Sequence, residues 1–94
     1  GHDSRGWSPA LVLSPDRYHN ISNSAIVCPI TSNIKPWDMK AILPDNLAAQ
    51  GAVLLDQVVS VDRRARGLHL IGHVPDDFLQ DVLNRLGVFL GIIR

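Results

Sequence analysis

The sequence predicts a mainly β protein that ends in one α-helix, with that helix packed on a small, strongly bent sheet or barrel. Three observations lead to this fold class. Short runs rich in β-branched residues alternate with polar connectors along most of the chain, and the apolar spacing becomes helical near the C-terminal end. The length of 94 residues suits one domain, 1–94. Because so short a chain buries only a modest fraction of its surface, we expect a partner subunit to stabilise it.

Each expected strand is a short run bounded by turn-forming residues. The polar segment "PDRYHNISNS" follows the first run as a loop, and "RRARG" forms a turn before the last run. In the second run, Pro29 favours a strand end or an edge, because it cannot donate a ladder hydrogen bond. The expected strands are 9–14, 25–31, 37–43, 51–62 and 68–74.

The last segment, "VPDDFLQDVLNRLGVFLG", has a different period. Pro75 suits the first helical turn, Asp76 and Asp77 favour its positive end, and Gly91 suits the position after the last turn. The sequence therefore predicts one amphipathic helix between Pro75 and Gly91. Its apolar stripe consists of Leu79, Val82, Leu83, Leu86 and Leu90.

Charge and cysteine content limit the classes of partner and compartment. Nine basic and nine acidic residues cancel, so the net charge predicts no polyanion partner. The cluster "RRAR" at 63–66 instead suits a site that grips a few phosphates. The single Cys28 cannot form an internal disulfide, and the apolar runs are far shorter than the roughly 20 residues that span a bilayer. With no secretory leader at the start, we expect a cytoplasmic protein without a membrane partner.

Four motifs resemble a known family in order and spacing. They are "G-H-D-x-x-G-x-x-P-A-L-V-L-S-P-x-x-Y", "V-C-P-I-T-S", "L-L-D-Q-V-x-S-V-D-x-R-A-R-G" and the terminal amphipathic helix. Together they closely resemble the MazF/PemK toxins, ribosome-independent endoribonucleases of toxin–antitoxin systems. The resemblance implies an SH3-like barrel of the CcdB/PemK type, assembled as a homodimer. It also implies cleavage of single-stranded mRNA at short sequences without a metal or other cofactor, and a cognate antitoxin whose peptide tail occupies the RNA groove.

Two departures from the family pattern matter. Family members normally begin with a further strand before the loop in which this chain starts, so we expect an N-terminally truncated domain with an unpaired sheet edge. The family also places an Arg immediately before the Pro that corresponds to Pro9, where this chain has Ser8.

Metal-free RNA cleavage of this kind uses the ribose 2′-hydroxyl as nucleophile and needs groups that stabilise charge on the phosphorane. By family position, Thr31 orients the phosphate, although a Thr at a strand end is also an ordinary β-favouring residue. Ser8 cannot replace the charge of an Arg. Arg5 could reach in as a surrogate, or be a solvated loop residue. The candidate catalytic residues are therefore Thr31, Ser8 and Arg5.

The remaining candidates are substrate-binding. A polar side chain such as Gln57 could meet a base edge or simply face outward, and the arginines of "RRAR" could bind phosphates or form a solvated turn paired with Asp62. Asp3 occupies the acidic position of the family loop, and its alternative is an ordinary exposed acid. The full set is Asp3, Ser32, Lys35, Gln57, Arg64 and Arg66.

Trp, His and Cys residues suggest three further roles. Trp37 could stack on a base, or belong to the core or a dimer contact. The four His residues are too scattered to indicate a metal site. Cys28 with a distant His could suggest a thiol hydrolase, but it lies in an apolar run without a supporting motif.

Two hypotheses of function follow, with a third as background. The first is an endoribonuclease toxin. The alternative is a catalytically degenerate module that binds antitoxin or RNA without cleaving it, which the neutral Ser8 would explain. A small-barrel interaction domain unrelated to RNA is the third.

Overall fold

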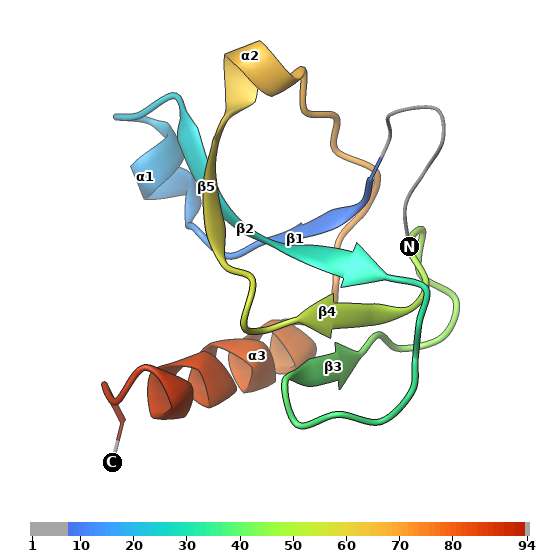
Figure 1. Ribbon diagram of the computed structural model, residues 1–94. Coiled ribbons are helices and arrows are strands. Elements are labelled where there is room, and N and C mark those ends of the chain that lie inside the picture. Colours follow the sequence, from blue (N-terminus) through green and yellow to red (C-terminus); the bar gives the residue numbers. More distant parts are fainter. Residues whose placement is uncertain (1–7, 94) are drawn as a thin grey trace.

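The computed structural model describes residues 8–93. Strands occupy its first two thirds and the longest helix follows near the C-terminal end, which confirms the predicted fold class (Figure 1). The elements in chain order are β1 (Ala10–Val12), α1 (Asp16–His19), β2 (Ser24–Thr31), β3 (Lys40–Ile42), β4 (Ala52–Leu54), β5 (Val59–Asp62), α2 (Arg63–Arg66) and α3 (Asp76–Phe89).

The long strand β2 is the centre of the antiparallel sheet. β1 pairs with one of its edges, while β5 and β4 share the other: Val27 lies opposite Val59 of β5, and Thr31 lies opposite Ala52 of β4. β3 extends the sheet beyond β4. Within residues 8–93 these pairings give a curled sheet that is not closed into a barrel.

The prediction that Pro29 marks a strand end or an edge was wrong. Pro29 lies inside β2, opposite Ala10 of β1. Ile30 donates its N–H to the Pro9 carbonyl on the β1 side, so the nitrogen of Pro29 faces the other edge, because successive residues alternate. That edge is the point where pairing changes from β5 to β4, and the missing N–H removes no ladder bond there.

Two expected strands differ in the structure. The run 51–62 is divided into β4 and β5, because the polar pair Asp56 and Gln57 makes a turn in which the Gln57 N–H donates to the Leu54 carbonyl at 3.3 Å. The segment 68–74 forms no strand. It connects α2 to α3, which lie on opposite sides of the molecule in Figure 1, and apolar residues alone do not supply a neighbouring ladder.

Two smaller differences concern the ends of elements. The strand expected over 37–43 is shortened to β3, since a turn precedes Lys40. The expected loop after β1 contains the single-turn helix α1. Both differences arise where backbone N–H groups donate to carbonyls three residues earlier, from Lys40 to Trp37 and from Tyr18 to Pro15.

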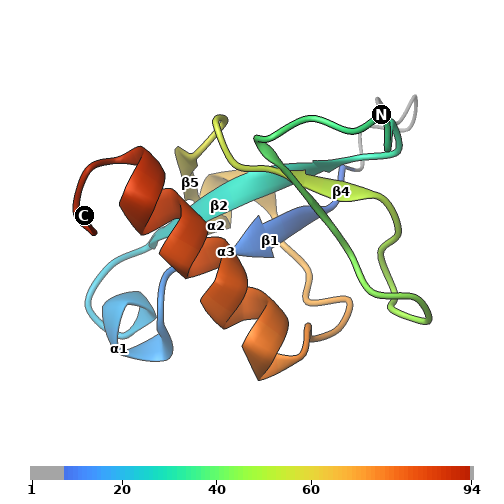
Figure 2. The ribbon, with the colours of Figure 1, turned by 90° about the horizontal axis from the view of Figure 1, so that it is seen from below.

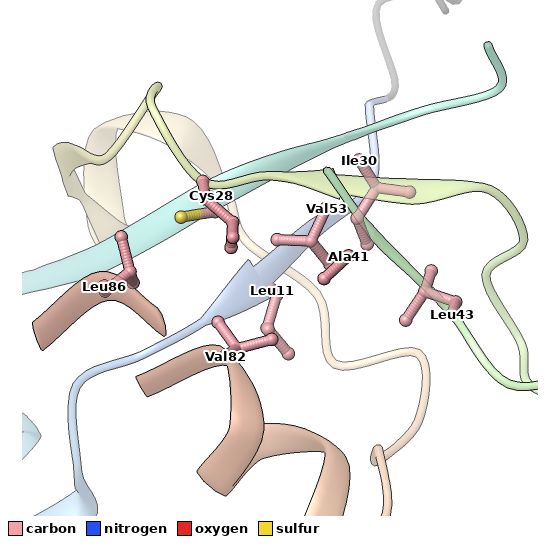
Figure 3. Close-up of a cluster of buried hydrophobic side chains, with 9 residues drawn as sticks. Leu11, Cys28, Ile30, Ala41, Leu43, Val53, Val82 and Leu86 are labelled. Carbon is pink, nitrogen blue, oxygen red and sulfur yellow. The ribbon is translucent and has the colours of Figure 1, made fainter. Parts of the chain in front are cut away.

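The hydrophobic core lies between the sheet and α3, which runs across the strands in Figure 2. From the predicted helical stripe, Val82 and Leu86 are buried and Leu79 packs against the core, whereas Leu83 and Leu90 remain exposed. Figure 3 shows Val82 and Leu86 of α3 facing the buried side chains of the strands. The buried cluster is Leu11, Cys28, Ile30, Ala41, Leu43, Val53, Leu55, Val82 and Leu86. None of the helices within residues 8–93 has the length and apolar character needed to cross a bilayer.

Candidate functional site

Thr31 is the last residue of β2 and the buried polar side chain of the described chain, with 8% of its surface exposed. Its neighbour Ile30 points into the core, so Thr31 belongs to the sheet face away from α3. The Thr31 Oγ1 accepts a hydrogen bond from the Asn33 N–H at 3.1 Å. This bond turns the chain out of the strand and fixes the side chain.

Ser8 lies two residues before β1, the strand that pairs with β2. Ala10 of β1 is opposite Pro29, and the Ile30 N–H donates to the Pro9 carbonyl at 3.1 Å, so the pairing continues beyond the strand. Continued two residues beyond the first residue of β1, this register sets Ser8 opposite Thr31. Directly opposed residues share a sheet face. The register therefore directs two of the predicted catalytic positions to the same end of the β1–β2 pair.

The row continues through the other strands. Thr31 is opposite Ala52 of β4, and Ala52 is opposite Ile42 of β3. The row is thus Ser8, Thr31, Ala52 and Ile42, with the two central residues buried and the two outer residues exposed. The only hydroxyl groups in this row are those of Ser8 and Thr31.

The loop after Thr31 is held by hydrogen bonds along its length. The Lys35 N–H donates to Asn33 Oδ1 at 3.0 Å, and Lys40 Nζ donates to the Lys35 carbonyl at 3.1 Å. From α3, Arg85 Nη2 donates to the carbonyls of Asp38 at 2.7 Å and Lys40 at 3.0 Å. The loop is therefore anchored to both the strand end and the helix.

Three predicted residues are carried by this loop. Ser32 and Lys35 are exposed beside Thr31. Trp37 is 51% exposed, so a core role for it is wrong. All three side chains are therefore open to solvent on the loop that follows Thr31.

The arginines of α2 lie elsewhere in the chain. β5 leads into α2, and Asp62 at its end is opposite Ser24, the first residue of β2. Thr31 is the last residue of the same strand. Seven residues separate the two ends, about 23 Å at roughly 3.3 Å per residue. Arg64 and Arg66 are exposed there, away from the Thr31 row within one chain.

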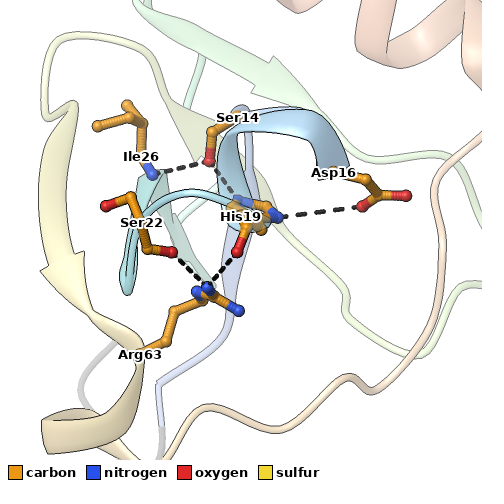
Figure 4. Close-up of polar contacts among 6 residues, drawn as sticks. All are labelled: Ser14, Asp16, His19, Ser22, Ile26 and Arg63. Carbon is orange, nitrogen blue, oxygen red and sulfur yellow. Dashed lines mark hydrogen bonds and ion pairs between the residues drawn. The ribbon is translucent and has the colours of Figure 1, made fainter.

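Arg63 differs from its neighbours in the "RRAR" cluster. Its Nη2 donates to the His19 carbonyl at 2.8 Å and to the Ser22 carbonyl at 2.5 Å (Figure 4). Asp62 caps α2 by accepting the N–H groups of Arg64 at 2.9 Å and Ala65 at 3.1 Å. These two backbone bonds, assisted by the nearby guanidinium charges, lower the pKa of the Asp62 carboxyl.

Gln57 is exposed in the turn between β4 and β5, so its expected mid-strand position was wrong. This turn follows Leu54, the last residue of β4, whereas Ala52 of the Thr31 row is the first residue of that strand. Asp3 and Arg5 lie outside the described residues.

Comparisons with known proteins settle the family. The family model described as PemK-like, MazF-like toxin of type II toxin–antitoxin system matches residues 1–90. The chain belongs to the PemK/MazF toxin family.

Relatives of established activity support this assignment. The chain is 33% identical over 91 residues to the endoribonuclease toxin MazF of Escherichia coli K12, covering 97% of this chain and 81% of that protein. It is 30% identical over 94 residues to the endoribonuclease PemK of E. coli, covering 96% of this chain and 71% of that protein.

Solved structures agree with the fold. A MazE–MazF structure from Deinococcus radiodurans superposes with a TM-score of 0.86 at 38% identity, covering 92% of this chain and 84% of that one. An endoribonuclease in complex with its cognate antitoxin from a mycobacterial species gives a TM-score of 0.80 at 15% identity, covering 93% and 84%, and shows the shared fold alone.

Two other chemistries, a reactive thiol and a metal site, depend on Cys28 and on the grouping of His, Cys and Asp side chains. Cys28 is fully buried, and burial together with the nearby Asp56 charge raises the pKa of its thiol to about 11. A nucleophilic cysteine needs the opposite shift. Among residues 8–93, no three His, Cys or Asp side chains are grouped so that they could hold a metal ion.

Sequence reasoning missed two residues that build the site. Asn33 ties the chain to Thr31, and Gly51 approaches the Thr31 backbone closely. The available signals were weak: an Asn two residues after a strand end, and a Gly directly before a β-branched run.

Proposed function

We propose that this chain is an endoribonuclease that cleaves single-stranded mRNA at short sequence motifs without a metal ion. The family assignment and the endoribonuclease relatives support the reaction class. The observation that carries the proposal is Thr31 itself: its buried hydroxyl is held by the Asn33 N–H at the end of β2, on the sheet face away from the core, and the register of β1 continues toward Ser8.

In the proposed reaction, the ribose 2′-oxygen attacks the adjacent phosphorus and the bond to the 5′-oxygen breaks. A proton leaves the 2′-hydroxyl and another reaches the departing 5′-oxygen. The role of Thr31 is to orient the phosphate through its hydroxyl, in a position fixed before the substrate arrives. Ser8 can donate one hydrogen bond to the phosphorane oxygens but carries no charge, so Arg5 is the proposed source of positive charge.

Substrate binding is proposed to extend from the Thr31 row along the exposed side chains. Ser32 and Lys35 follow Thr31 directly, and their exposure suits contact with the sugar–phosphate backbone. The more distant proposed contacts are Asp3, Gln57, Arg64 and Arg66.

A partner of this chain is proposed to cover the apolar end of α3. Several large apolar side chains there are exposed, and a second copy of the chain would bury them in a homodimer. These residues are Val88, Phe89, Leu90, Ile92 and Ile93. A cognate antitoxin is the second proposed partner, by analogy with the MazE–MazF structure from Deinococcus radiodurans. The mRNA substrate places the proposed activity in the cytoplasm.

The test is cleavage of a long, weakly structured RNA by the purified chain in excess chelator. Thr31→Val keeps the branched shape without the hydroxyl, and Thr31→Ser keeps the hydroxyl. We expect cleavage in chelator, retained by Thr31→Ser and lowered about 10²- to 10³-fold by Thr31→Val. Equal activity of the native chain and Thr31→Val would remove Thr31 from the mechanism.

The alternative function is binding of RNA or antitoxin without cleavage. The neutral, exposed Ser8 in the Thr31 row favours it, since no described residue of that row carries a charge. A Ser8→Arg variant separates the two. If only Ser8→Arg cleaves RNA, the native chain is the binding module.

A further inference from the structure

Gly51, directly before β4, approaches the backbone of the candidate site more closely than any side chain would permit. Its φ of +120° lies in a region that L-residues rarely adopt. A Cβ at this position would overlap the Thr31 carbonyl oxygen and would lie 3.0 Å from the Thr31 carbonyl carbon and 3.4 Å from Ser32 Cα. All three contacts are with backbone atoms, which cannot rotate away as a flexible side chain would.

The same residue is fixed from the other side. The Gly51 carbonyl accepts the Leu43 N–H at 2.9 Å, just beyond the end of β3. The next residue, Ala52, is the partner of Thr31 in the sheet. A retreat of Gly51 from Thr31 would lengthen the Leu43–Gly51 hydrogen bond, which extends the pairing of β3 with β4.

The contact falls where Thr31 leaves the strand. On one side of Thr31 the ladder to Ala52 fixes the backbone, and on the other the Oγ1 bond to the Asn33 N–H starts the loop. A displacement of the Thr31 carbonyl shifts the plane between Thr31 and Ser32, and with it the path toward Asn33. The position of the Thr31 hydroxyl thus depends on residue 51 having no side chain.

We infer that Gly51 is a positioning residue for Thr31, acting through the backbone and without touching substrate. The expected effect of a Gly51 substitution on rate rests on the proposed ribonuclease function. The expected effect on structure rests on geometry alone. A misplacement of about 1 Å in a catalytic group lowers a rate about 10²-fold.

The kinetic test compares Gly51→Ala with Gly67→Ala. Gly67 also has a positive φ, +59°, but a Cβ there would meet nothing within 4 Å, so this control carries backbone strain without the contact. We expect Gly51→Ala to lower kcat for RNA cleavage in chelator about 10²-fold with little change in KM, and Gly67→Ala to retain kcat.

A double variant shows whether the effect passes through Thr31. If it does, Gly51→Ala added to Thr31→Val causes little further loss, because the positioned hydroxyl is already absent. Losses that multiply would mean general damage and would overturn the inference. So would a Gly51→Ala chain that no longer folds, because Gly51 would then serve the whole sheet.

A readout independent of activity is the amide resonance of Asn33, measured by NMR. We expect Gly51→Ala to shift this resonance and speed its hydrogen exchange, since its acceptor is Thr31 Oγ1. The Leu13 N–H, which donates to Ile26 at 2.8 Å, is the control and stays unchanged. If the Asn33 amide resonance does not shift in Gly51→Ala, the inference is overturned. If the native chain does not cleave RNA, only the proposed function is overturned.

Discussion

The C-terminal end of β2 and the "RRAR" cluster in α2 were both expected to contact RNA, yet they are built differently. Thr31 is buried, and its surroundings are fixed by strand pairing and backbone contacts. Arg64 and Arg66 stand in solvent on a single helical turn, held by one capping carboxylate. The end of β2 is therefore a site that positions one side chain, whereas α2 is an exposed surface that attracts negative charge.

The C-terminal end of β2 depends on the packed core beneath it. Shortening a core side chain should therefore lower the free energy of unfolding more than any other substitution considered below. Leu55 follows β4, is 0% exposed, and donates its N–H to the Met39 carbonyl at 2.7 Å. Leu55→Ala removes buried methyl groups and leaves a cavity, so the free energy of unfolding should fall by about 2–5 kcal/mol. Urea denaturation followed by circular dichroism measures this loss.

The matched control for that variant is Leu70→Ala. Leu70 is 78% exposed in the segment between α2 and α3. The same substitution there should change the free energy of unfolding by no more than about 0.5 kcal/mol. Equal losses at the two leucines would show that the sheet and α3 do not form the stabilising core.

The second region holds together through Arg63, and its loss is the next effect in size. Arg63→Ala leaves the carbonyls of His19 and Ser22 without their guanidinium donor, which should lower the free energy of unfolding by about 1–3 kcal/mol. The Arg63 Nε is buried and has no hydrogen-bond partner among the described residues, which favours the lower half of that range.

Two variants sharpen this prediction. Arg63→Lys should not restore the loss, because an ammonium lacks the planar fork that suits two carbonyls at once. Arg64→Ala should be almost neutral for stability, since the Arg64 side chain is exposed. A larger loss for Arg64→Ala than for Arg63→Ala would reverse the structural roles given to the two residues.

The sequence predicted the fold class, the terminal helix and the position of Thr31. These features depend on the spacing of apolar residues and on motifs that match the family in order and spacing. It failed at Pro29, where the suitability of a proline depends on which neighbouring strand pairs with each edge. It failed over 68–74 for a related reason: apolar residues indicate a strand only when another strand is available beside them. The close approach of Gly51 to Thr31 joins segments 20 residues apart, and no local pattern carries it.

The same limit applies to the arginines. The sequence named Arg64 and Arg66 as candidate phosphate contacts, and it gave no sign that Arg63 would bond to the carbonyls of a distant loop. Spacing alone could not assign these roles, because Arg63 bonds to carbonyls more than 40 residues away in the chain.

The smallest predicted effect concerns the cap of α2 and its dependence on pH. The two backbone N–H donors lower the pKa of Asp62 in the folded state relative to the unfolded chain. A lowered carboxyl pKa stabilises the fold at pH values above the unfolded pKa, and this contribution is lost as the pH falls through the folded pKa. Asp62→Ala should therefore be less stable than the native chain at pH 7, with the difference disappearing in acid.

Urea midpoints of the two proteins between pH 7 and pH 2 measure this difference. Asp45→Ala, at an exposed loop position, is the control for general charge removal. Because Asp62 is itself exposed, salt should weaken its attraction to the arginines more than its bonds to the N–H groups. A difference that persists at high salt but disappears at low pH would assign the stabilisation to the cap, whereas one abolished by salt would assign it to the arginine charges.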